Sequence, residues 1–282
     1  MSSKTTRILE VFRNKYFLAG FLMMMPLLLM AVFGPLFIPY SETRMGNNLT
    51  DQPPSSRYLL GTDSYGRDVF AVLVHAIGQS FLIGFIAGGI SNIIGLVIGL
   101  TGAYKGGFLG QILGNFTVVF MVIPTMPILT VFAAYVRLLT IPQMSILIAL
   151  FSWSWSARTI RAQTLTLKER DFVGLSRLSG TSFFGIVFKE IMPQMLSFIV
   201  TSFISGIGWA MMNEIAVELI GLGPQNVQTL GWMLYWIMQG GAMIKGMWWW
   251  MLAPSLALIA SFVGLQFLNI GLDAVFNPRL RR

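Results

Sequence analysis

Six long stretches of the chain contain no Asp, Glu, Lys or Arg and consist mainly of apolar residues. They cover residues 16–41, 69–104, 106–136, 138–157, 191–213 and 246–272. A helix that crosses a bilayer needs about 20 predominantly apolar residues, and it satisfies its own backbone hydrogen bonds in lipid. The pattern therefore predicts an all-α integral membrane protein with six transmembrane helices.

Two of these stretches predict irregular geometry. The stretch 69–104 is too long for one crossing, so we expect its first part, VFAVLVHAIG, to lie along the membrane surface before residues 79–104 cross. In VIPTMPIL, Pro124 and Pro127 have no backbone N–H, which predicts a kinked or locally opened third helix. We divide the chain into an N-terminal anchor helix with an extracellular segment, residues 1–66, and a five-helix core, residues 67–282.

The distribution of basic residues predicts the orientation. With the N-terminus inside and six crossings, 14 of the 19 Lys and Arg residues fall in cytoplasmic segments. Cytoplasmic loops are enriched in Lys and Arg, so both termini are expected in the cytoplasm. The basic start followed by a long apolar run fits an uncleaved anchor better than a signal peptide. Topology then explains the net charge of +8, and we expect no nucleic-acid partner.

Composition argues against several kinds of site. Only 11% of the residues are charged, against about 25% in soluble proteins. The chain has no Cys, and its single His, His75, has no second ligand candidate nearby, so no metal site is expected. The phosphate-binding pattern Gly-x-x-x-x-Gly-Lys-Ser/Thr is absent. We therefore predict no catalytic residue and no ATP site in this chain.

One charged segment, residues 158–190, interrupts the apolar pattern. It is predicted to be a cytoplasmic loop, because each charge at the bilayer centre costs about 2.5–3.5 kcal/mol and seven fall between residues 158 and 177. Within it, Phe172, Val173, Leu175 and Leu178 recur at helical spacing, and Gly180 follows where a helix would end. This predicts a short amphipathic helix, whose apolar face rests either on a protein partner or on lipid headgroups.

Three separated motifs resemble one protein family. The run TIRAQTLTLKERDFVGLSRLSGTSFFGIVFKEIMPQML resembles the cytoplasmic loop of permease subunits of ATP-binding-cassette importers, with the signature Gly at Gly180 and the later Pro at Pro193. The element LLGTDSYGRDVF resembles the Leu-Gly-Thr-Asp-x-x-Gly-Arg-Asp element of one permease subunit of peptide, nickel and oligosaccharide importers. EIAVELIGLGPQNVQTLGWMLYW, GMWWWMLAPSLAL and GLDAVFNPRLRR follow the order of the family's C-terminal third.

The resemblance implies a type I importer permease fold that forms half of a translocation pore in a prokaryotic cytoplasmic membrane. The implied partners are a second homologous permease, two ATPase subunits that bind ATP and Mg²⁺, and an extracytoplasmic solute-binding protein. The wording of TLGWMLYW and GLDAVFNPRLR is closer to the oligosaccharide branch, with cello-oligosaccharides as an example of cargo. Di- and oligopeptides are the alternative cargo. A secondary transporter working alone would show an internal repeat and charged residues within several spans, and neither is apparent.

The resemblance also implies site residues. In the family the loop helix docks into an ATPase, although Gly174, Leu175 and Ser176 stand where the usual Glu-Ala-Ala triplet would be. The expected ATPase-coupling residues are Glu169, Arg170, Asp171, Phe172, Val173, Gly174, Leu175, Ser176, Arg177, Leu178 and Gly180. The expected translocation-path residues are Asn213, Glu214, Glu218, Trp209, Pro124 and Pro127.

Two of these assignments have structural alternatives. Glu214 and Glu218 are four residues apart on one helical face, and they either line the path or hold the following loop. The Trp residues, including the run 248–250, either stack on sugar or form an interfacial belt, and the belt is favoured. In LLGTDSYGRDVF, Arg67 and Asp68 are expected to pair locally, and the element is expected to shape the start of the next helix.

Overall fold

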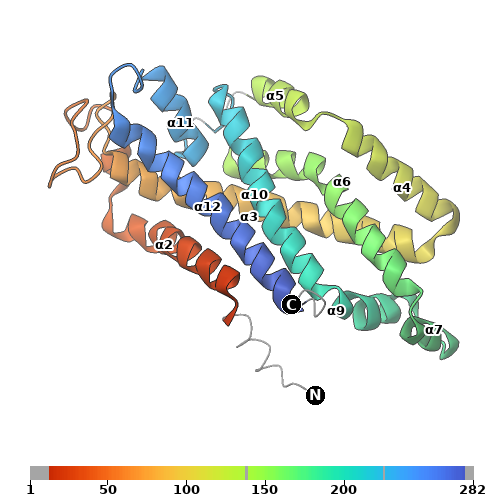
Figure 1. The fold of residues 1–282 in the computed structure, drawn as a ribbon. Coiled ribbons are helices and arrows are strands. Elements are labelled where there is room, and N and C mark those ends of the chain that lie inside the picture. Colours follow the sequence, from red (N-terminus) through yellow and green to blue (C-terminus); the bar gives the residue numbers. More distant parts are fainter. Residues whose placement is uncertain (1–12, 137–138, 225, 277–282) are drawn as a thin grey trace.

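The computed structural model describes residues 13–136, 139–224 and 226–276, which form helices joined by loops (Figure 1). The elements are α2 (Lys15–Phe37), η1 (Tyr40–Thr43), α3 (Val69–Lys105), α4 (Gly107–Val122), α5 (Thr125–Tyr135), α6 (Ile141–Lys168), α7 (Asp171–Leu178), α8 (Phe183–Gly185), the π-helix η2 (Ile186–Ile191), α9 (Met192–Gln194), α10 (Leu196–Leu219), α11 (Leu230–Gln239) and α12 (Trp248–Phe276). The loop after η1 and helix α11 lie at one end of the molecule, and α7 lies at the other (Figure 1).

The predicted spans correspond to helices with one qualification. Within the described residues, α2, α3, α10 and α12 are each long and apolar enough to cross a membrane, and α4 with α5 passes as a bent pair. The bend of 73° falls at Pro124, the residue before α5, which confirms the predicted opening at VIPTMPIL. Helix α6 fills the fourth predicted stretch with 28 residues, but its Ser, Thr and charged residues leave it outside this group. Six crossings therefore stay a prediction.

Helix α3 corrects the expected surface segment. Residues 69–105 form one continuous helix of 37 residues, about 55 Å long at 1.5 Å per residue. The Asp68 carboxylate caps its start by accepting hydrogen bonds from the N–H groups of Phe70 and Ala71, at 2.8 and 3.3 Å. A helix lying on a membrane would keep one face exposed, but Val69, Val74 and Ile77 are all buried in the core. The apolar run in this first part is therefore core sequence.

Glycines on α3 allow its neighbours to approach closely. A Cβ atom at Gly88 would lie 2.9 Å from the backbone nitrogen of Ile207 on α10, and one at Gly99 would lie 2.7 Å from the carbonyl oxygen of Ala157 on α6. Small residues at such contacts are how helices associate in lipid, where apolar burial between helices gains little. Helix α3 is thus the central element against which α6 and α10 pack.

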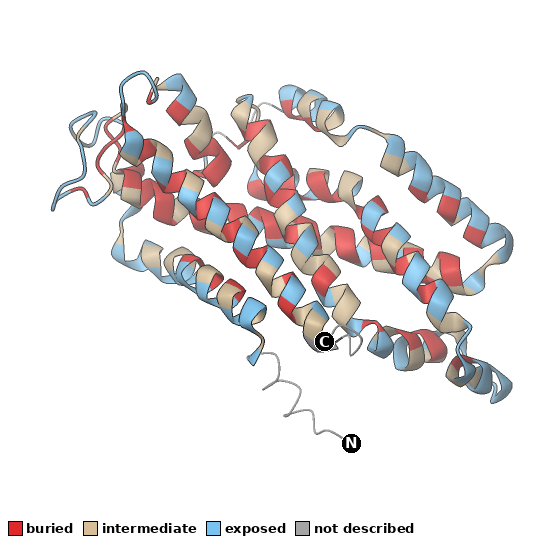
Figure 2. Cartoon of the chain, viewed as in Figure 1, coloured by how far each residue is buried: buried red, intermediate tan, exposed pale blue. Residues whose placement is uncertain are grey.

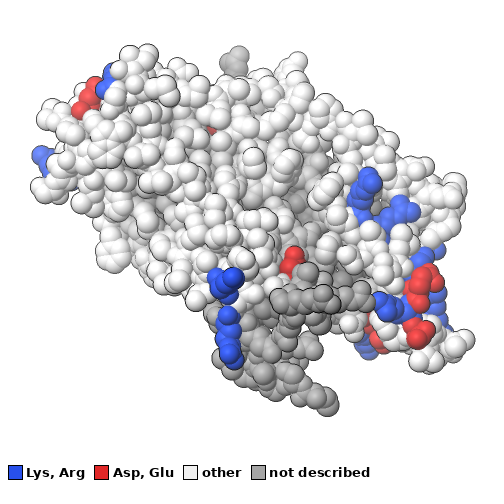
Figure 3. All heavy atoms as spheres, viewed as in Figure 1, with Lys and Arg blue, Asp and Glu red and all other residues white. Residues whose placement is uncertain are grey.

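The outer surfaces of the bundle are apolar. Leu22 and Val32 on α2 and Phe108 and Val122 on α4 are exposed, and both helices show long exposed faces in Figure 2. The charged side chains gather toward the ends of the molecule and leave a broad uncharged region between them (Figure 3). An apolar band flanked by charged ends matches the profile of a bilayer.

Candidate functional site

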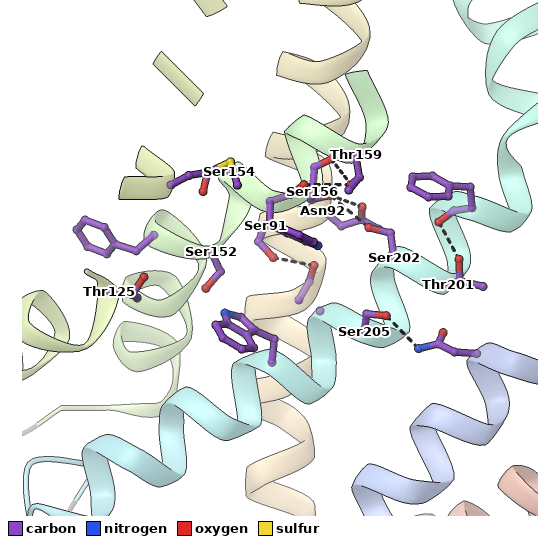
Figure 4. Close-up of a pocket in the computed structure, with 18 of the residues that line it drawn as sticks. Ser91, Asn92, Thr125, Ser152, Ser154, Ser156, Thr159, Thr201, Ser202 and Ser205 are labelled. Atoms are coloured by element: carbon purple, nitrogen blue, oxygen red, sulfur yellow. Dashed lines mark hydrogen bonds between the residues drawn. The ribbon is translucent and has the colours of Figure 1, made fainter. Parts of the chain in front are cut away.

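A cavity of about 640 Å³ lies between helices α3, α4, α5, α6, α10 and α12. Its lining is rich in hydroxyl groups, which come from several helices and point toward the same space (Figure 4). The hydroxyl residues are Ser91, Thr125, Ser152, Ser154, Ser156, Thr159, Thr201, Ser202 and Ser205. The other lining residues include Asn92, Gln266, Asn269 and Asp273, together with Phe120, Phe151, Trp155, Phe198 and Trp209. No described Lys or Arg side chain lines it.

A hydrogen-bond network holds this lining in place. Ser156 on α6 donates to Asn92 Oδ1 at 3.1 Å, and Asn92 Nδ2 on α3 donates to the carbonyl oxygen of Ile199 on α10 at 3.1 Å. Asn269 Nδ2 on α12 donates to Ser205 Oγ on α10 at 3.0 Å. Polar groups at membrane depth are satisfied by such interhelical bonds. The network therefore joins four helices around one polar space.

Two lining atoms have no hydrogen-bond partner among the described residues. They are Ser152 Oγ and Asn269 Oδ1, and both are buried within the cavity wall. A buried polar atom without a partner is uncommon in native structures. Such an atom can still form a hydrogen bond with solvent or a ligand. Together with the aromatic rings, this lining can contact a polar solute by hydrogen bonds and apolar faces while holding few fixed charges.

Trp209 is the one predicted path residue that lies in the lining. Pro124 precedes the lining residue Thr125, and Pro127 lies in the first turn of α5, outside the lining. Asn213 is buried and donates its Nδ2 to the carbonyl oxygen of Trp209 at 2.8 Å, on its own helix.

Glu214 and Glu218 face α11 and do not line the cavity. Thr229 Oγ1 donates to Glu218 Oε1 at 3.4 Å. A Cβ atom at Gly231 would lie 3.0 Å from Glu214 Oε1. Both glutamates are fully buried, so the alternative in which they hold the following loop fits this geometry better than a place on the path.

Sequence reasoning missed most of the lining. A single hydroxyl residue in an apolar helix does not by itself predict a site. A signal was present, because Ser152 and Ser156 are four apart on α6, and Ser202, Ser205 and Trp209 follow the i, i+3, i+7 spacing of one face of α10. Polar positions on one face of an apolar helix indicate a face turned away from lipid.

The predicted short helix in the charged loop is present as α7. Val173 on its inner face is fully buried against a cluster that includes Ile160 and Ile186, whereas Leu175 and Leu178 are 65% and 87% exposed. Gly180 has a φ of +75°, the left-handed conformation that favours glycine after a helix end. Of the expected coupling residues, Val173 is buried, and Phe172 and Ser176 are half-buried. All the others are exposed.

Helix α7 is bound to the C-terminal end of α3. Arg177 Nε donates to the Tyr104 hydroxyl oxygen at 3.3 Å, and the guanidinium lies 4.9 Å from the centre of the Tyr104 ring. Lys168, the last residue of α6 and three residues before α7, donates its Nζ to the carbonyl oxygen of Ala103 on α3 at 3.1 Å. A displacement of α7 would therefore act directly on α3, the helix that contributes Ser91 and Asn92 to the cavity.

The element LLGTDSYGRDVF holds the opposite end of α3. Arg67 pairs with Asp63 and not with Asp68, which caps α3 instead, so the expected pairing was wrong. The Arg67 guanidinium is buried 4.6 Å from the Trp232 ring and 5.1 Å from the Trp236 ring. Burial lowers the pKa of Arg67, and the attraction of Asp63 opposes that shift. The element is a tertiary anchor between α11 and residues 40–68, a segment called the outer loop after its expected side of the membrane.

The Trp run at the start of α12 is only partly an interfacial belt. Trp248 is exposed, but Trp250 is fully buried in the core. Trp249 Nε1 donates to the carbonyl oxygen of Thr62 at 3.3 Å, which joins α12 to the outer loop. Trp249 and Trp250 therefore hold the fold together, and the exposed Trp248 ring lies edge-on to Trp249, 5.9 Å between ring centres.

Comparison with known sequences covers nearly the whole chain. The family described as "Binding-protein-dependent transport system inner membrane component" matches residues 91–282, and "N-terminal TM domain of oligopeptide transport permease C" matches residues 9–54. The chain is 32% identical to the oligopeptide transport system permease protein OppC of Lactococcus lactis subsp. lactis (strain IL1403) over 269 residues, 91% of this chain and 90% of the relative. It is 28% identical to the dipeptide transport system permease protein DppC of Bacillus subtilis (strain 168) over 272 residues, 96% of this chain and 84% of the relative.

Proposed function

This chain belongs to the family of binding-protein-dependent transport system inner membrane components, and on that premise we propose that it is a permease subunit of an ATP-driven importer of short peptides. It is a multi-pass protein of the cytoplasmic membrane. The observation that carries the proposal is the similarity over 91% of the chain to a permease named for oligopeptide transport. The motifs in the C-terminal third had favoured oligosaccharides, and the comparisons support the peptide alternative instead. Apart from Asp273 in GLDAVFNPRLRR, the described residues of those motifs lie outside the cavity lining, so most of their wording does not report on cargo.

The cavity is the part of the path that this subunit contributes. Its volume of about 640 Å³ lies within the range of about 300–1,000 Å³ usual for small-ligand sites. Peptides present amide groups and varied side chains, which hydroxyl groups and aromatic rings can contact without selecting one sequence. We propose that a second homologous permease forms the other half of the path and that an extracytoplasmic binding protein delivers the cargo.

In the proposed membrane topology, the chain crosses the bilayer six times. The crossings are α2, α3, the bent pair α4–α5, α6, α10 and α12, with both termini in the cytoplasm. This arrangement places the outer loop and α11 outside and α7 inside, in agreement with their positions at opposite ends of the molecule (Figure 1). The positive-inside distribution of Lys and Arg supports the same orientation.

Helix α7 is the proposed contact with an ATPase subunit. Leu175 and Leu178 are exposed on it beside the charged residues Asp171 and Arg177, which is the composition of a polar interface with apolar anchors. ATP and Mg²⁺ would be bound by two partner ATPase subunits. When these close on ATP, they would displace α7, and the contacts of Arg177 and Lys168 with α3 would transmit the movement to the cavity.

Reconstitution tests the proposal. The chain would be purified with its second permease and ATPases, inserted into liposomes, and supplied with the cognate binding protein, ATP and radiolabelled cargo. We expect ATP-dependent uptake of dipeptides and longer peptides and no uptake of cello-oligosaccharides. Uptake of the sugars alone would overturn the peptide assignment, and uptake by this chain without ATPases would overturn its role as a permease subunit.

A further inference from the structure

The α12 wall of the cavity differs from the other walls in its chemistry. Gln266, Asn269 and Asp273 all line the cavity from α12. Their spacing of three and four residues puts them on one face of the helix, one turn after another. Asp273 is the one charged residue in the described lining. A carboxylate at a single place in an otherwise uncharged cavity gives that wall a negative potential.

Asn269, a residue of the same lining, has an unused acceptor. Its side chain is 93% removed from solvent, with 7% exposed, and its Nδ2 group is held by the bond to Ser205 Oγ at 3.0 Å. That bond is drawn from Ser205 in Figure 4. Asn269 Oδ1 has no hydrogen-bond partner among the described residues. With Nδ2 held by Ser205, the unpaired Oδ1 is the atom of this lining amide that is left to accept a hydrogen bond.

The Asp273 carboxylate is free to act with this oxygen. It forms no ion pair with any residue that the structure describes. Arg158 contacts the lining elsewhere, with its Nη1 3.9 Å from Met121 Sδ on the α4–α6 side of the cavity. Since α12 contributes the Asp273 wall, this cation belongs to a different wall.

We propose that Asn269 Oδ1 and the Asp273 carboxylate form a subsite for an ammonium group, the free amino end of the peptide cargo. An ammonium group has three donors and a positive charge, and this wall offers acceptors and one negative charge within one helical turn. The carboxylate attracts the charge, and the amide oxygen accepts one N–H. The inference rests on the proposed peptide function and adds to it a preference for cargo with a free amino terminus.

The test compares two cargos in one reconstituted importer. Uptake of alanyl-alanine and of N-acetyl-alanyl-alanine is measured in parallel, and the ratio of the two rates is the readout. The preference of the binding protein enters every ratio equally, and so does the amount of active complex. A variant that folds less well therefore lowers both rates without changing the ratio.

We expect Asp273→Asn to lower the ratio about tenfold, because a hydrogen bond to a charged group is lost, although Asp273 is exposed. Asn269→Leu should lower the ratio about threefold, since it removes a neutral acceptor. Asp273→Glu keeps the carboxylate and should keep most of the preference. The matched control is Asp51→Asn, which removes an Asp from the outer loop and should leave the ratio at its wild-type value.

Each other outcome counts against the subsite. An unchanged ratio in Asp273→Asn and Asn269→Leu, or an equal loss of uptake for both cargos, would overturn amine recognition while leaving the peptide function intact. If the wild-type importer takes up neither cargo but transports another class of solute, the peptide function is refuted, and the amine subsite falls with it.

Discussion

Replacing Arg67 is the sharpest test of how the outer end of the protein is held together. Its side chain and that of its partner Asp63 are 1% and 3% exposed, so the ion pair is buried. In Arg67→Leu, the Asp63 carboxylate would keep only the backbone N–H groups of Tyr65 and Arg67, at 2.8 and 2.9 Å. Removing one partner of a buried pair costs about 3–5 kcal/mol, because the other charge stays buried.

Contacts with aromatic rings add to this cost. The guanidinium lies within 4.9 Å of the Tyr65 ring and 4.6 Å of the Trp232 ring, and a desolvated cation–π contact contributes about 2 kcal/mol. These terms are not additive, and leucine recovers part of the packing. We expect the outer loop, residues 40–68, to lose about 4 kcal/mol of local stability.

Hydrogen–deuterium exchange measures this loss directly. The amide of Thr62 donates to the carbonyl of Gln52 at 2.8 Å, and that of Asp63 donates to the carbonyl of Arg67 at 3.0 Å. A loss of about 4 kcal/mol would accelerate their exchange by about three orders of magnitude. The same amides report on the loop in every variant.

Two variants separate the causes. Arg57→Leu removes an exposed Arg from the same loop, 5.2 Å from the Tyr58 ring, and should cost no more than about 1 kcal/mol. Adding Asp63→Asn to Arg67→Leu removes the unpaired charge and should restore part of the protection. Exchange in Arg67→Leu within threefold of wild type would refute the view that this buried pair anchors the loop.

Four further predictions concern Gly180 after α7, Tyr104 on α3, the buried Glu214, and the pH dependence of Asp51. Gly180→Val should uncouple ATP hydrolysis from uptake while Gly180→Asn retains coupling, because the φ of +75° and not the available space excludes side chains there; ATP consumed per peptide imported is the measurement, and equal coupling in both variants would contradict it. Tyr104→Ala should lower the same coupling severalfold more than Tyr104→Phe, which keeps the ring under Arg177; identical effects would mean that the ring does not transmit force. Glu214→Gln should change uptake per assembled complex by less than about twofold, since the side chain is buried away from the cavity; a large loss with intact assembly would return Glu214 to the path. The hydrogen bond from Ser64, followed by the interaction with Lys245, lowers the pKa of Asp51 below its usual 3.8. The ion pair between Asp51 and Lys245 is therefore present above pH 3.8 and is lost as pH falls through the lowered pKa. The carboxyl signal of Asp51 in NMR would show this titration, and a pKa at or above the usual value would contradict it.

The motif resemblance favoured oligosaccharides as cargo, whereas the similar proteins are peptide permeases. The described residues of the C-terminal motifs lie in α10, α11 and α12 and in the loop before α11, where most of them serve packing: Trp232 lies beside Arg67, and Trp250 is buried in the core. Residues that hold a shared fold together are alike across branches with different cargo, so their wording carries little information on what passes through the cavity.

The sequence by itself determined the class of protein, the apolar stretches, the break at Pro124 and the charged loop with its short helix. These follow from local rules: lipid demands long apolar segments, proline interrupts a helix, and glycine allows the left-handed residue that ends one. Only the tertiary structure decided that the start of α3 is core and that Arg67 is buried against Trp232 and Trp236 of α11. It alone brought Ser156, Asn92 and Asn269 around one cavity and turned Glu214 away from it. Those facts depend on which faces of distant helices meet, and such long-range contacts have no signature in a single local stretch of sequence.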